Sequence, residues 1–430
     1  MRRLLVIVAL ALVLLQGCSV NPVTGKRQLD LIGEAQEVEL GKSIYPQAIQ
    51  GSFGPIEDAA TQDEVHRLGA ALAAVGHRPN LPYEFTAVNE PDANAFALPG
   101  GKICITRGLL GRLESEDGAA AVLAHEIGHV TARHAVSQYN RQLLATALLV
   151  GGSAVMEAKD VRNRGVIALG AAVGLQLGLA HYSREMERQS DELGLEYAVK
   201  AGYSPYGMVE TQKILLSLGN GSPGLVERMF ASHPMSAERL ATAEKRVAAL
   251  PADVRERPLR KDPYRRALRT VLAEQPAWEL AREGRSLLAK KQLGPAEQKL
   301  ASAVRQAPKA GVIRALHAAS LASNKRYQDA ANEAQEGVRL APNLFITRVI
   351  AGELQLKTDP RGALANLDVA ESLLPEVAEV ALMRGRALEA LGQRQAAVEA
   401  YKQAYQRDPQ GEVGAEAVKR LQALGVVASG

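Results

Sequence analysis

The chain has 430 residues, more than one compact core usually holds, so two or three domains are expected. Apolar residues make up 47% of the sequence and aromatic residues only 4%, which favours helices packed through small side chains over a large sheet. The formal net charge is +4, and the charges are interspersed without a basic stripe, which argues against a nucleic-acid-binding protein.

The N-terminus has the pattern of a secretory signal. Two arginines precede an unbroken apolar run at residues 4–15, which is too short to span a membrane, so residues 1–17 are predicted to be a signal peptide. The small residue before Cys18 resembles the lipobox of bacterial lipoproteins, in which the cysteine is lipidated and attaches the mature chain to a membrane. The alternative is an ordinary signal peptide with an incidental cysteine.

Residues 18–30 are polar and rich in turn-forming residues, which suits a lipid-anchored tether. Ser19 follows the cysteine, and by resemblance to Gram-negative lipoproteins this suggests sorting to the outer membrane. If Cys18 is lipidated, only Cys104 remains, so no intramolecular disulfide can form. Cys104 lies in an apolar alternating run and is predicted to be a buried core residue.

Strands and helices are predicted in the middle of the chain. Residues 83–88 and 94–106 have strand patterns, and a Pro-Gly-Gly turn inside the second stretch predicts a hairpin. An acidic first turn at Glu116 opens a long helix that is expected to continue through Ala135. A further helix is expected from about residue 182 to residue 201.

Two apolar segments lie between these helices, at residues 141–156 and 165–180. Each is shorter than the roughly 20 residues that a membrane-spanning helix needs, so a buried helical hairpin is favoured over membrane insertion. Further along the chain, prolines and charges mark residues 251–275 as a linker.

Residues 276–430 contain an internal repeat. Four prolines are spaced by 34, 33 and 34 residues, and small residues recur five, twelve and twenty-four positions before each of them. The prolines are Pro308, Pro342, Pro375 and Pro409, and the alanines twelve positions earlier are Ala296, Ala330, Ala363 and Ala397. This pattern resembles the tetratricopeptide repeat, in which small residues let two antiparallel helices approach closely and a proline ends the second helix. An α-solenoid with a concave face for peptide or protein partners is predicted.

The motif that carries chemistry is His125-Glu126-Ile127-Gly128-His129. Histidines at i and i+4 lie on the same side of a helix, so both imidazoles can reach one metal ion. Glu126 lies between them in sequence, where it can act as general base toward a metal-bound water that attacks a peptide bond. The flanking residues are apolar, and two histidines and a glutamate on such a buried helix would be costly without a metal.

A catalytic zinc site needs a third protein ligand and an open position. Glu187 is the candidate, because Asp191 lies one helical turn later on the same face and can hydrogen-bond the outer nitrogen of a histidine ligand. Glu185 is a rival ligand, but no carboxylate lies four residues after it. A solvated acidic face is the plainer alternative.

Together these residues resemble one family of zinc metallopeptidases, the HtpX and CAAX-prenyl-protease family. The resemblance rests on the His125-Glu126-x-x-His129 motif, on Glu187 with Asp191, on His233 with Arg239, and on residues 94–101 and 106–109 upstream of the motif. Residues 21–25 also resemble the opening of secreted lipoprotein members of that family. Prenyl-protein processing is not implied, since this chain has no spanning helix after the signal.

The resemblance implies a fold and a biological setting. The fold class is mainly α with a small β-hairpin or sheet: a gluzincin-type domain at residues 31–250, holding one Zn²⁺ per chain, followed by the solenoid. It also implies a periplasmic protein, lipid-anchored to the outer membrane, that acts in outer-membrane protein quality control. The substrates would be unfolded or misassembled outer-membrane proteins, and the repeats would bind a protein of the assembly machinery.

Two further sets of residues are candidates. His233 and Arg239 can donate hydrogen bonds to the oxyanion, and in close relatives a histidine in this motif can occupy the fourth zinc position and hold the enzyme latent. The edge of the 94–106 hairpin, at Asn94, Ala95, Phe96 and Ala97, is expected to pair with an extended substrate.

Two other functions stay open. One is a chaperone or assembly scaffold that acts through its repeats and has a structural or latent zinc site. The other is a scaffold with an inactive protease domain. The intact Glu126 argues against a structural site, which has no need of a base at that position.

Overall fold

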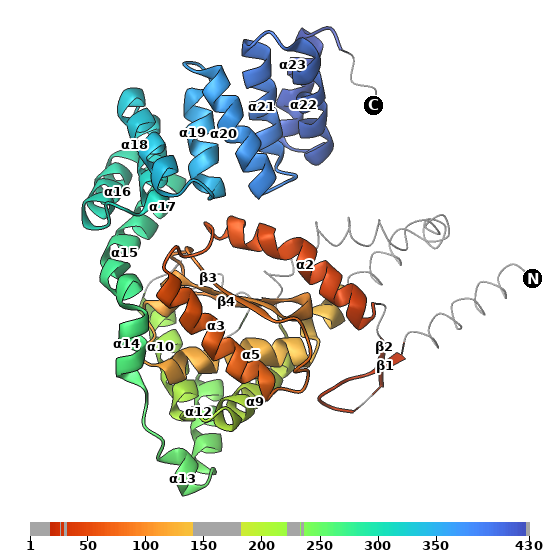
Figure 1. Ribbon diagram of the computed structural model, residues 1–430, viewed down its shortest axis with the longest axis vertical. Coiled ribbons are helices and arrows are strands. Elements are labelled where there is room, and N and C mark those ends of the chain that lie inside the picture. The colour runs from red at the N-terminus through yellow and green to blue at the C-terminus, as the bar shows by residue number, and fades with distance from the viewer. Residues whose placement is uncertain are drawn as a thin grey trace, which may run out of the picture. The chain divides into compact units, whose positions relative to one another are not determined.

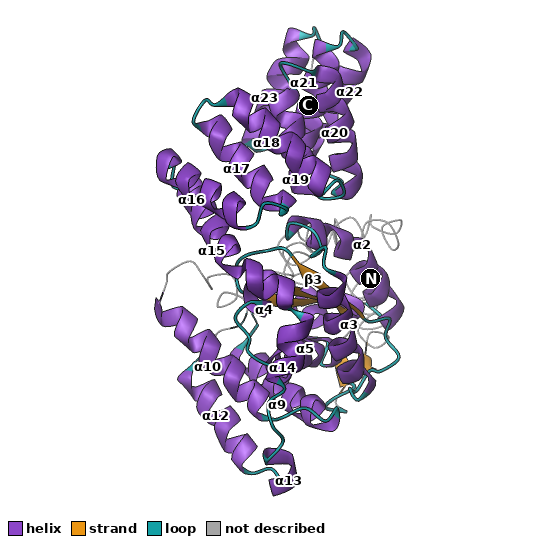
Figure 2. Cartoon of the chain, turned by 60° about the vertical axis from the view of Figure 1, so that its left-hand side comes forward, coloured by secondary structure: helices purple, strands orange, loops and turns teal. Residues whose placement is uncertain are grey.

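The computed structural model describes residues 18–25, 27–29, 32–140, 182–221, 233 and 236–426. Helices predominate, and the strands of the described residues form one two-stranded and one three-stranded sheet (Figure 2). The predicted fold class, mainly helical with a small sheet, is confirmed. The expected signal peptide and the apolar segments at 141–156 and 165–180 lie outside the described residues. No helix in the described ranges is long and apolar enough to cross a bilayer.

The chain forms two compact units, each with its own core (Figure 1). The first contains the described residues up to Ala48, together with Ile56–Val88 and Asp92–Leu272. The second contains Ile49–Pro55, Asn89–Pro91 and the described residues from Ala273 onward.

The sheet of the first unit has the strand order β3-β5-β4. The central strand β5 (Lys102–Thr106) pairs parallel with β3 (Glu84–Val88) and antiparallel with β4 (Ala95–Leu98). The turn between β4 and β5 is the short 3-10 helix η1 (Pro99–Gly101), in which both glycines have positive φ. The predicted hairpin is therefore confirmed, and β4 has no partner on its outer edge among the described strands.

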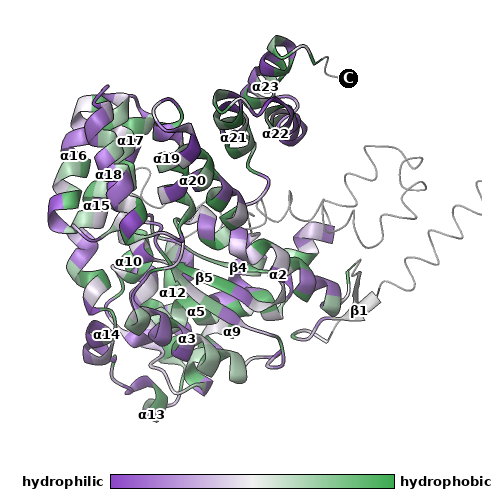
Figure 3. Cartoon of the chain, turned by 45° about the horizontal axis from the view of Figure 1, so that its top comes forward, coloured by the Kyte–Doolittle hydropathy of each residue, from purple (hydrophilic) through white to green (hydrophobic). Residues whose placement is uncertain are grey.

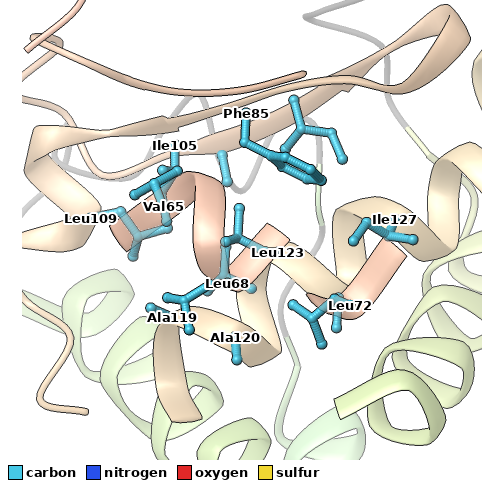
Figure 4. Packing of buried hydrophobic residues seen from close by; sticks show 14 of the residues in the cluster. Val65, Leu68, Leu72, Phe85, Ile105, Leu109, Ala119, Ala120, Leu123 and Ile127 are labelled. Atoms are coloured by element: carbon cyan, nitrogen blue, oxygen red, sulfur yellow. The ribbon is translucent and has the colours of Figure 1, made fainter. Parts of the chain in front are cut away.

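Helices cover both faces of this sheet (Figure 1). On one face, α3 (Ala59–Ala74) and α5 (Glu116–Thr131) pack their apolar side chains against Phe85 and Ile105 (Figure 4). On the other face lies α2 (Glu34–Gly51), whose Tyr45 hydroxyl is 2.6 Å from Thr86 Oγ1. Phe85 and Thr86, which are neighbours in β3, thus point to opposite faces of the sheet, because successive side chains of a strand alternate between its two faces.

The helix that was expected to run through Ala135 is shorter. It ends at Thr131, and Ala132 caps it before Arg133 adopts a left-handed φ of 58°. A left-handed residue ends a helix because it turns the backbone out of the helical path. Arg133 is held in place by Glu37, whose Oε2 lies 3.0 Å from the Arg133 Nε, so a long-range ion pair fixes the break. Residues 134–140 form a separate helical segment.

The segments predicted to be a tether and a linker contain regular secondary structure. In the predicted tether, β1 (Cys18–Val20) and β2 (Arg27–Leu29) pair antiparallel. The predicted linker is largely helical: it holds α13 (Ala252–Arg255), α14 (Lys261–Ala267) and the start of α15 (Arg269–Ala289). The segment is helical because its apolar side chains recur at helical spacing and pack into the core of the first unit. Tyr264, Leu268 and Val271 are fully buried there.

Further described helices of the first unit lie around α5. They are α9 (Arg184–Lys200), α10 (Tyr206–Gly221) and α12 (Ala237–Ala248), and the short α4 (Arg107–Leu110) follows β5. The helix predicted near residues 182–201 is confirmed by α9. Cys104, in β5, is fully buried as expected.

The second unit stacks helix pairs. The pairs are α15 with α16 (Leu293–Gln306), α17 (Gly311–Ser323) with α18 (Tyr327–Leu340), α19 (Phe345–Gln355) with α20 (Pro360–Leu373), and α21 (Ala378–Ala390) with α22 (Arg394–Arg407), followed by α23 (Glu412–Ala423). Hydrophilic and hydrophobic residues alternate along these helices (Figure 3). The repeat alanines at positions 296, 330, 363 and 397 are fully buried, and each repeat proline lies two residues after the end of a second helix. The predicted tetratricopeptide solenoid is confirmed.

Candidate metal centre

The His125-Glu126-x-x-His129 motif lies on α5, which begins at a well-formed cap. Ser115 Oγ accepts a hydrogen bond from Gly118 N at 3.0 Å, and the acidic residues that follow suit the positive end of the helix dipole. Every residue of α5 is buried. One helical turn separates His125 from His129, and their Nε2 atoms are 3.1 Å apart, both directed to one point.

The predicted third ligand comes from α9. Glu187 is 1% exposed, and its carboxylate oxygens lie 3.4 Å from His129 Nε2 and 3.5 Å from His125 Nε2. The approach is close because glycines face backbone at the crossing of α5 and α9. A Cβ on Gly128 would lie 3.1 Å from the backbone of Ser190, and a Cβ on Gly194 would lie 3.0 Å from His125 N.

His233 completes the cluster. Its Nδ1 lies 2.9 Å from Glu187 Oε1 and 3.4 Å from His125 Nε2. The ligand atoms of His125, His129, Glu187 and His233 all lie within 4.8 Å of one another, and all four residues are buried. A tetrahedral site with metal–nitrogen bonds of about 2.0–2.1 Å places its ligand atoms roughly 3.3 Å apart, which agrees with these separations.

The outer nitrogens of both motif histidines are engaged. Asp191 Oδ1 lies 3.0 Å from His125 Nδ1, and His134 Nδ1 lies 2.9 Å from His129 Nδ1. With Nδ1 serving as the donor in each ring, both Nε2 atoms present lone pairs to each other and to a carboxylate. Such an arrangement is repulsive unless a cation lies between the atoms, so the donor set fits a divalent metal.

His134 is a contributor that the sequence reasoning missed. Its second nitrogen, Nε2, donates to Gln189 Oε1 at 3.0 Å, so hydrogen-bond donation runs from His129 through His134 to Gln189. The Tyr182 ring also packs on His129, with ring centroids 3.9 Å apart. The spacing of five residues between His129 and His134 gave no signal, since it brings the two rings together only because α5 ends between them.

Asp191 and Arg239 lie behind the ligands. The Arg239 guanidinium forms two hydrogen bonds of 2.7 Å to the Asp191 carboxylate, and its third nitrogen lies 2.7 Å from Glu187 Oε2. These contacts favour a role for Arg239 in orienting Glu187 and Asp191 over the predicted role as oxyanion donor.

The pKa shifts of Glu187, His129 and Asp191 suit metal ligation. Burial would raise the pKa of Glu187, but nearby His233 and hydrogen bonds with His129 and His233 outweigh it and hold the pKa well below its usual value. Burial lowers the pKa of His129 well below its usual value. Burial would likewise raise the pKa of Asp191, yet hydrogen bonds with His125 and Arg239 lower it. Ionised carboxylates and neutral imidazoles are the forms that bind metals.

A small cavity opens beside the cluster, and Glu126 lines it. Glu126 is 2% exposed, and its Oε2 has no hydrogen-bond partner among the described residues. Ala95, from the expected substrate strand, lines the same cavity, and Asn94 beside it has an Oδ1 without a hydrogen-bond partner among the described residues.

Phe96 and Ala97 continue β4, with Ala97 buried in the core. Cys18, at the start of β1, is not part of this cluster.

Comparison with known proteins gives a consistent result. Residues 59–247 match the model of peptidase family M48. The chain is 29% identical over 214 residues to the beta-barrel assembly-enhancing protease of Escherichia coli K12, covering 49% of this chain and 44% of that protein. It is 28% identical over 228 residues to the mitochondrial metalloendopeptidase OMA1 of Schizosaccharomyces pombe, covering 52% and 65%. The corresponding protein of Arabidopsis thaliana is 33% identical over 185 residues, covering 43% and 36%. The chain thus spans less than half the length of the E. coli relative.

Proposed function

Since residues 59–247 match the model of peptidase family M48, we propose that this protein is a zinc-dependent endopeptidase. The observation that carries the proposal is the buried cluster of His125, His129 and Glu187 beside Glu126, whose Oε2 has no hydrogen-bond partner among the described residues. Two imidazoles and one carboxylate form the ligand set of many hydrolytic zinc sites, which keep one position open for water or substrate.

In the proposed mechanism, Glu126 takes a proton from the attacking water and delivers it to the leaving amine. Bound zinc would polarise the scissile carbonyl and make the water more acidic. Asp191 holds the His125 ring, and Arg239 holds Glu187 and Asp191, so the ligands keep their orientation. The Nε2 of His233 lies 3.7 Å from Glu126 Oε1, has no hydrogen-bond partner among the described residues and is a candidate donor to the oxyanion.

The substrate would bind as an extended strand. The outer edge of β4 has no partner strand in the described part of the chain, and Ala95 of that strand lines the cavity with Glu126. Main-chain hydrogen bonds from residues 94–97 would give affinity with little sequence preference.

His233 also suits a latch. Its Nδ1 lies within the ligand cluster, so the imidazole can fill the position that water or substrate needs. The latch predicts that removing this ring raises basal proteolysis, whereas a role limited to oxyanion stabilisation predicts that it lowers it.

The test compares the mature wild-type chain with Glu126→Gln and His233→Ala, using zinc analysis and cleavage of unfolded casein. Glu126→Gln is expected to keep its zinc and to lose about 10²–10⁴-fold in cleavage rate, because only the base is removed. Equal cleavage by wild type and Glu126→Gln, or a wild type without zinc, would contradict the proposal. If zinc is bound but neither wild type nor His233→Ala cleaves, a chaperone or assembly scaffold becomes the better description.

We further propose a periplasmic protein, anchored to the outer membrane by lipid on Cys18, that degrades or assists unfolded or misassembled outer-membrane proteins. The support is the signal-like N-terminus, the similarity to a protein named for β-barrel assembly, and a solenoid suited to an assembly-machinery partner. Cys18→Ala is expected to move the protein from the membrane fraction to the soluble fraction. An unchanged distribution would contradict anchoring through this residue.

A further inference from the structure

A buried amide without a partner lies in the wall of the cavity beside the metal centre. Gln212, on α10, is 2% exposed, and neither its Oε1 nor its Nε2 has a hydrogen-bond partner among the described residues. The side chain lines the same cavity as His125 and Glu126. No step of the proposed hydrolysis uses it.

The surroundings of Gln212 do not satisfy the amide. On the same face of α10, Met208 and Leu215 are apolar, and the Thr211 hydroxyl donates to Gly118 O at 3.1 Å. Folded proteins rarely leave both polar atoms of a buried amide unpaired, because neither its donor nor its acceptor recovers the hydrogen bonds lost with water. The amide is therefore arranged for a ligand that offers one acceptor and one donor.

The same unit contains a completed version of such an arrangement. Gln62 Oε1 accepts from Ala87 N at 3.0 Å, and Gln62 Nε2 donates to Ala87 O at 2.8 Å. One glutamine amide thus binds both main-chain groups of a single residue in the extended strand β3. An extended peptide presents the same pair of groups at every second residue along one edge.

We propose that Gln212 binds the main chain of an extended peptide substrate, with Nε2 donating to the carbonyl of one residue and Oε1 accepting from its N–H. The inference rests on the proposed function, because the peptide must enter the cavity that Glu126 faces. The outer edge of β4, which pairs with no other described strand, reaches the same cavity at Ala95, so the peptide is held by a strand edge and by α10. Gln212 is a binding residue that recognises backbone and not side chains.

The test measures binding and not cleavage. Short synthetic peptides tiled along casein are titrated against full-length Glu126→Gln, and the tightest binder is remade with an ester in place of each backbone amide in turn. One of these esters removes the N–H that donates a hydrogen bond to Gln212 Oε1. This ester is expected to bind Glu126→Gln about tenfold more weakly than the amide peptide, because one good hydrogen bond is lost. In the double variant Glu126→Gln/Gln212→Leu, the same ester is expected to cause no further loss.

Met208→Leu in the Glu126→Gln background is the matched control, since it also places a leucine in this wall but leaves the amide intact. It is expected to keep the discrimination between amide and ester. An ester profile that is the same with and without Gln212, or no binding of any peptide, would overturn the inference. If an ester weakens binding only when Gln212 is present, but the wild-type protein cleaves no substrate, the proposed activity would be overturned and the role of Gln212 would stand.

Discussion

The metal-centre helix and the solenoid helices are buried by opposite means. Along α5, polar side chains such as His125, Glu126 and His129 are buried with the apolar ones, and partners come from distant elements. In the solenoid, the buried repeat positions hold alanine or glycine, and ion pairs such as that between Arg326 and Asp329 lie half exposed at the surface.

The difference matters for what each region tolerates. A buried polar group depends on one or two specific partners, and removing a partner leaves the group unsatisfied in a region without water. A solenoid repeat depends on close apolar contact, which the next repeat supplies again in nearly the same form. Changes at the metal centre should therefore act on chemistry and metal binding, whereas changes in the repeats should act on packing.

At the metal centre, a large effect on zinc affinity is expected at His134, which contacts the proposed ligand His129 and does not line the cavity. His134→Ala should weaken zinc binding by about 10–100-fold, because the acceptor that fixes the donor nitrogen of His129 is lost. Competition with a chelator of known zinc affinity measures the change.

His134→Asn is the conservative comparison. The asparagine Oδ1 can replace the Nδ1 of His134 as acceptor, so this variant should recover part of the lost zinc affinity. The unfolding temperature of the metal-free protein is the second measurement. If His134 served only in packing, both substitutions would lower this temperature, and the two variants would not differ in zinc affinity. Equal zinc affinity in wild type and His134→Ala would contradict a positioning role.

The comparison also explains what could be predicted from the sequence. The solenoid was predictable because its packing repeats along the chain, so one alanine position recurs at 296, 330, 363 and 397. His125 and His129 were predictable because their spacing matches one helical turn. Glu187 and Asp191 followed from the same helical rule, and the structure brings both to the motif histidines.

The missed features all depend on contacts between distant segments. The end of α5 is set by the pairing of Arg133 with Glu37, which lies 96 residues earlier. Gln212 lies on a helix with no motif, and only the folded cavity shows that its amide lacks a partner among the described residues. The prediction of a linker was wrong for a related reason. Its prolines and charges indicated an exposed segment, whereas Tyr264 and Leu268 are fully buried in the folded chain.

A smaller effect, on packing alone, is expected in the last complete repeat. A Cβ on Gly385 would lie 2.4 Å from the ring of Tyr401, which is fully buried, so Gly385→Ala should destabilise the fold by about 1–3 kcal/mol despite the better helix propensity of alanine. Gly294→Ala is the matched control. Gly294 lies in α16, and a Cβ added there would meet no other atom within 4 Å, so this change should be neutral or stabilising by up to about 1 kcal/mol. Thermal unfolding followed by circular dichroism measures both.

The repeat itself supplies the compensating change. In the first repeat, the residue equivalent to Tyr401 is Leu300, which faces Gly284, and in the third repeat an alanine at 351 is found where the last repeat has Gly385. Tyr401→Leu should therefore relieve most of the destabilisation in Gly385→Ala, so the two substitutions together should cost less than the sum of their separate effects. Additive costs would mean that the glycine is needed for backbone reasons and not for the ring that it faces. Neither substitution should change zinc affinity, because packing in the solenoid and polar pairing at the metal centre are stabilised by different contacts.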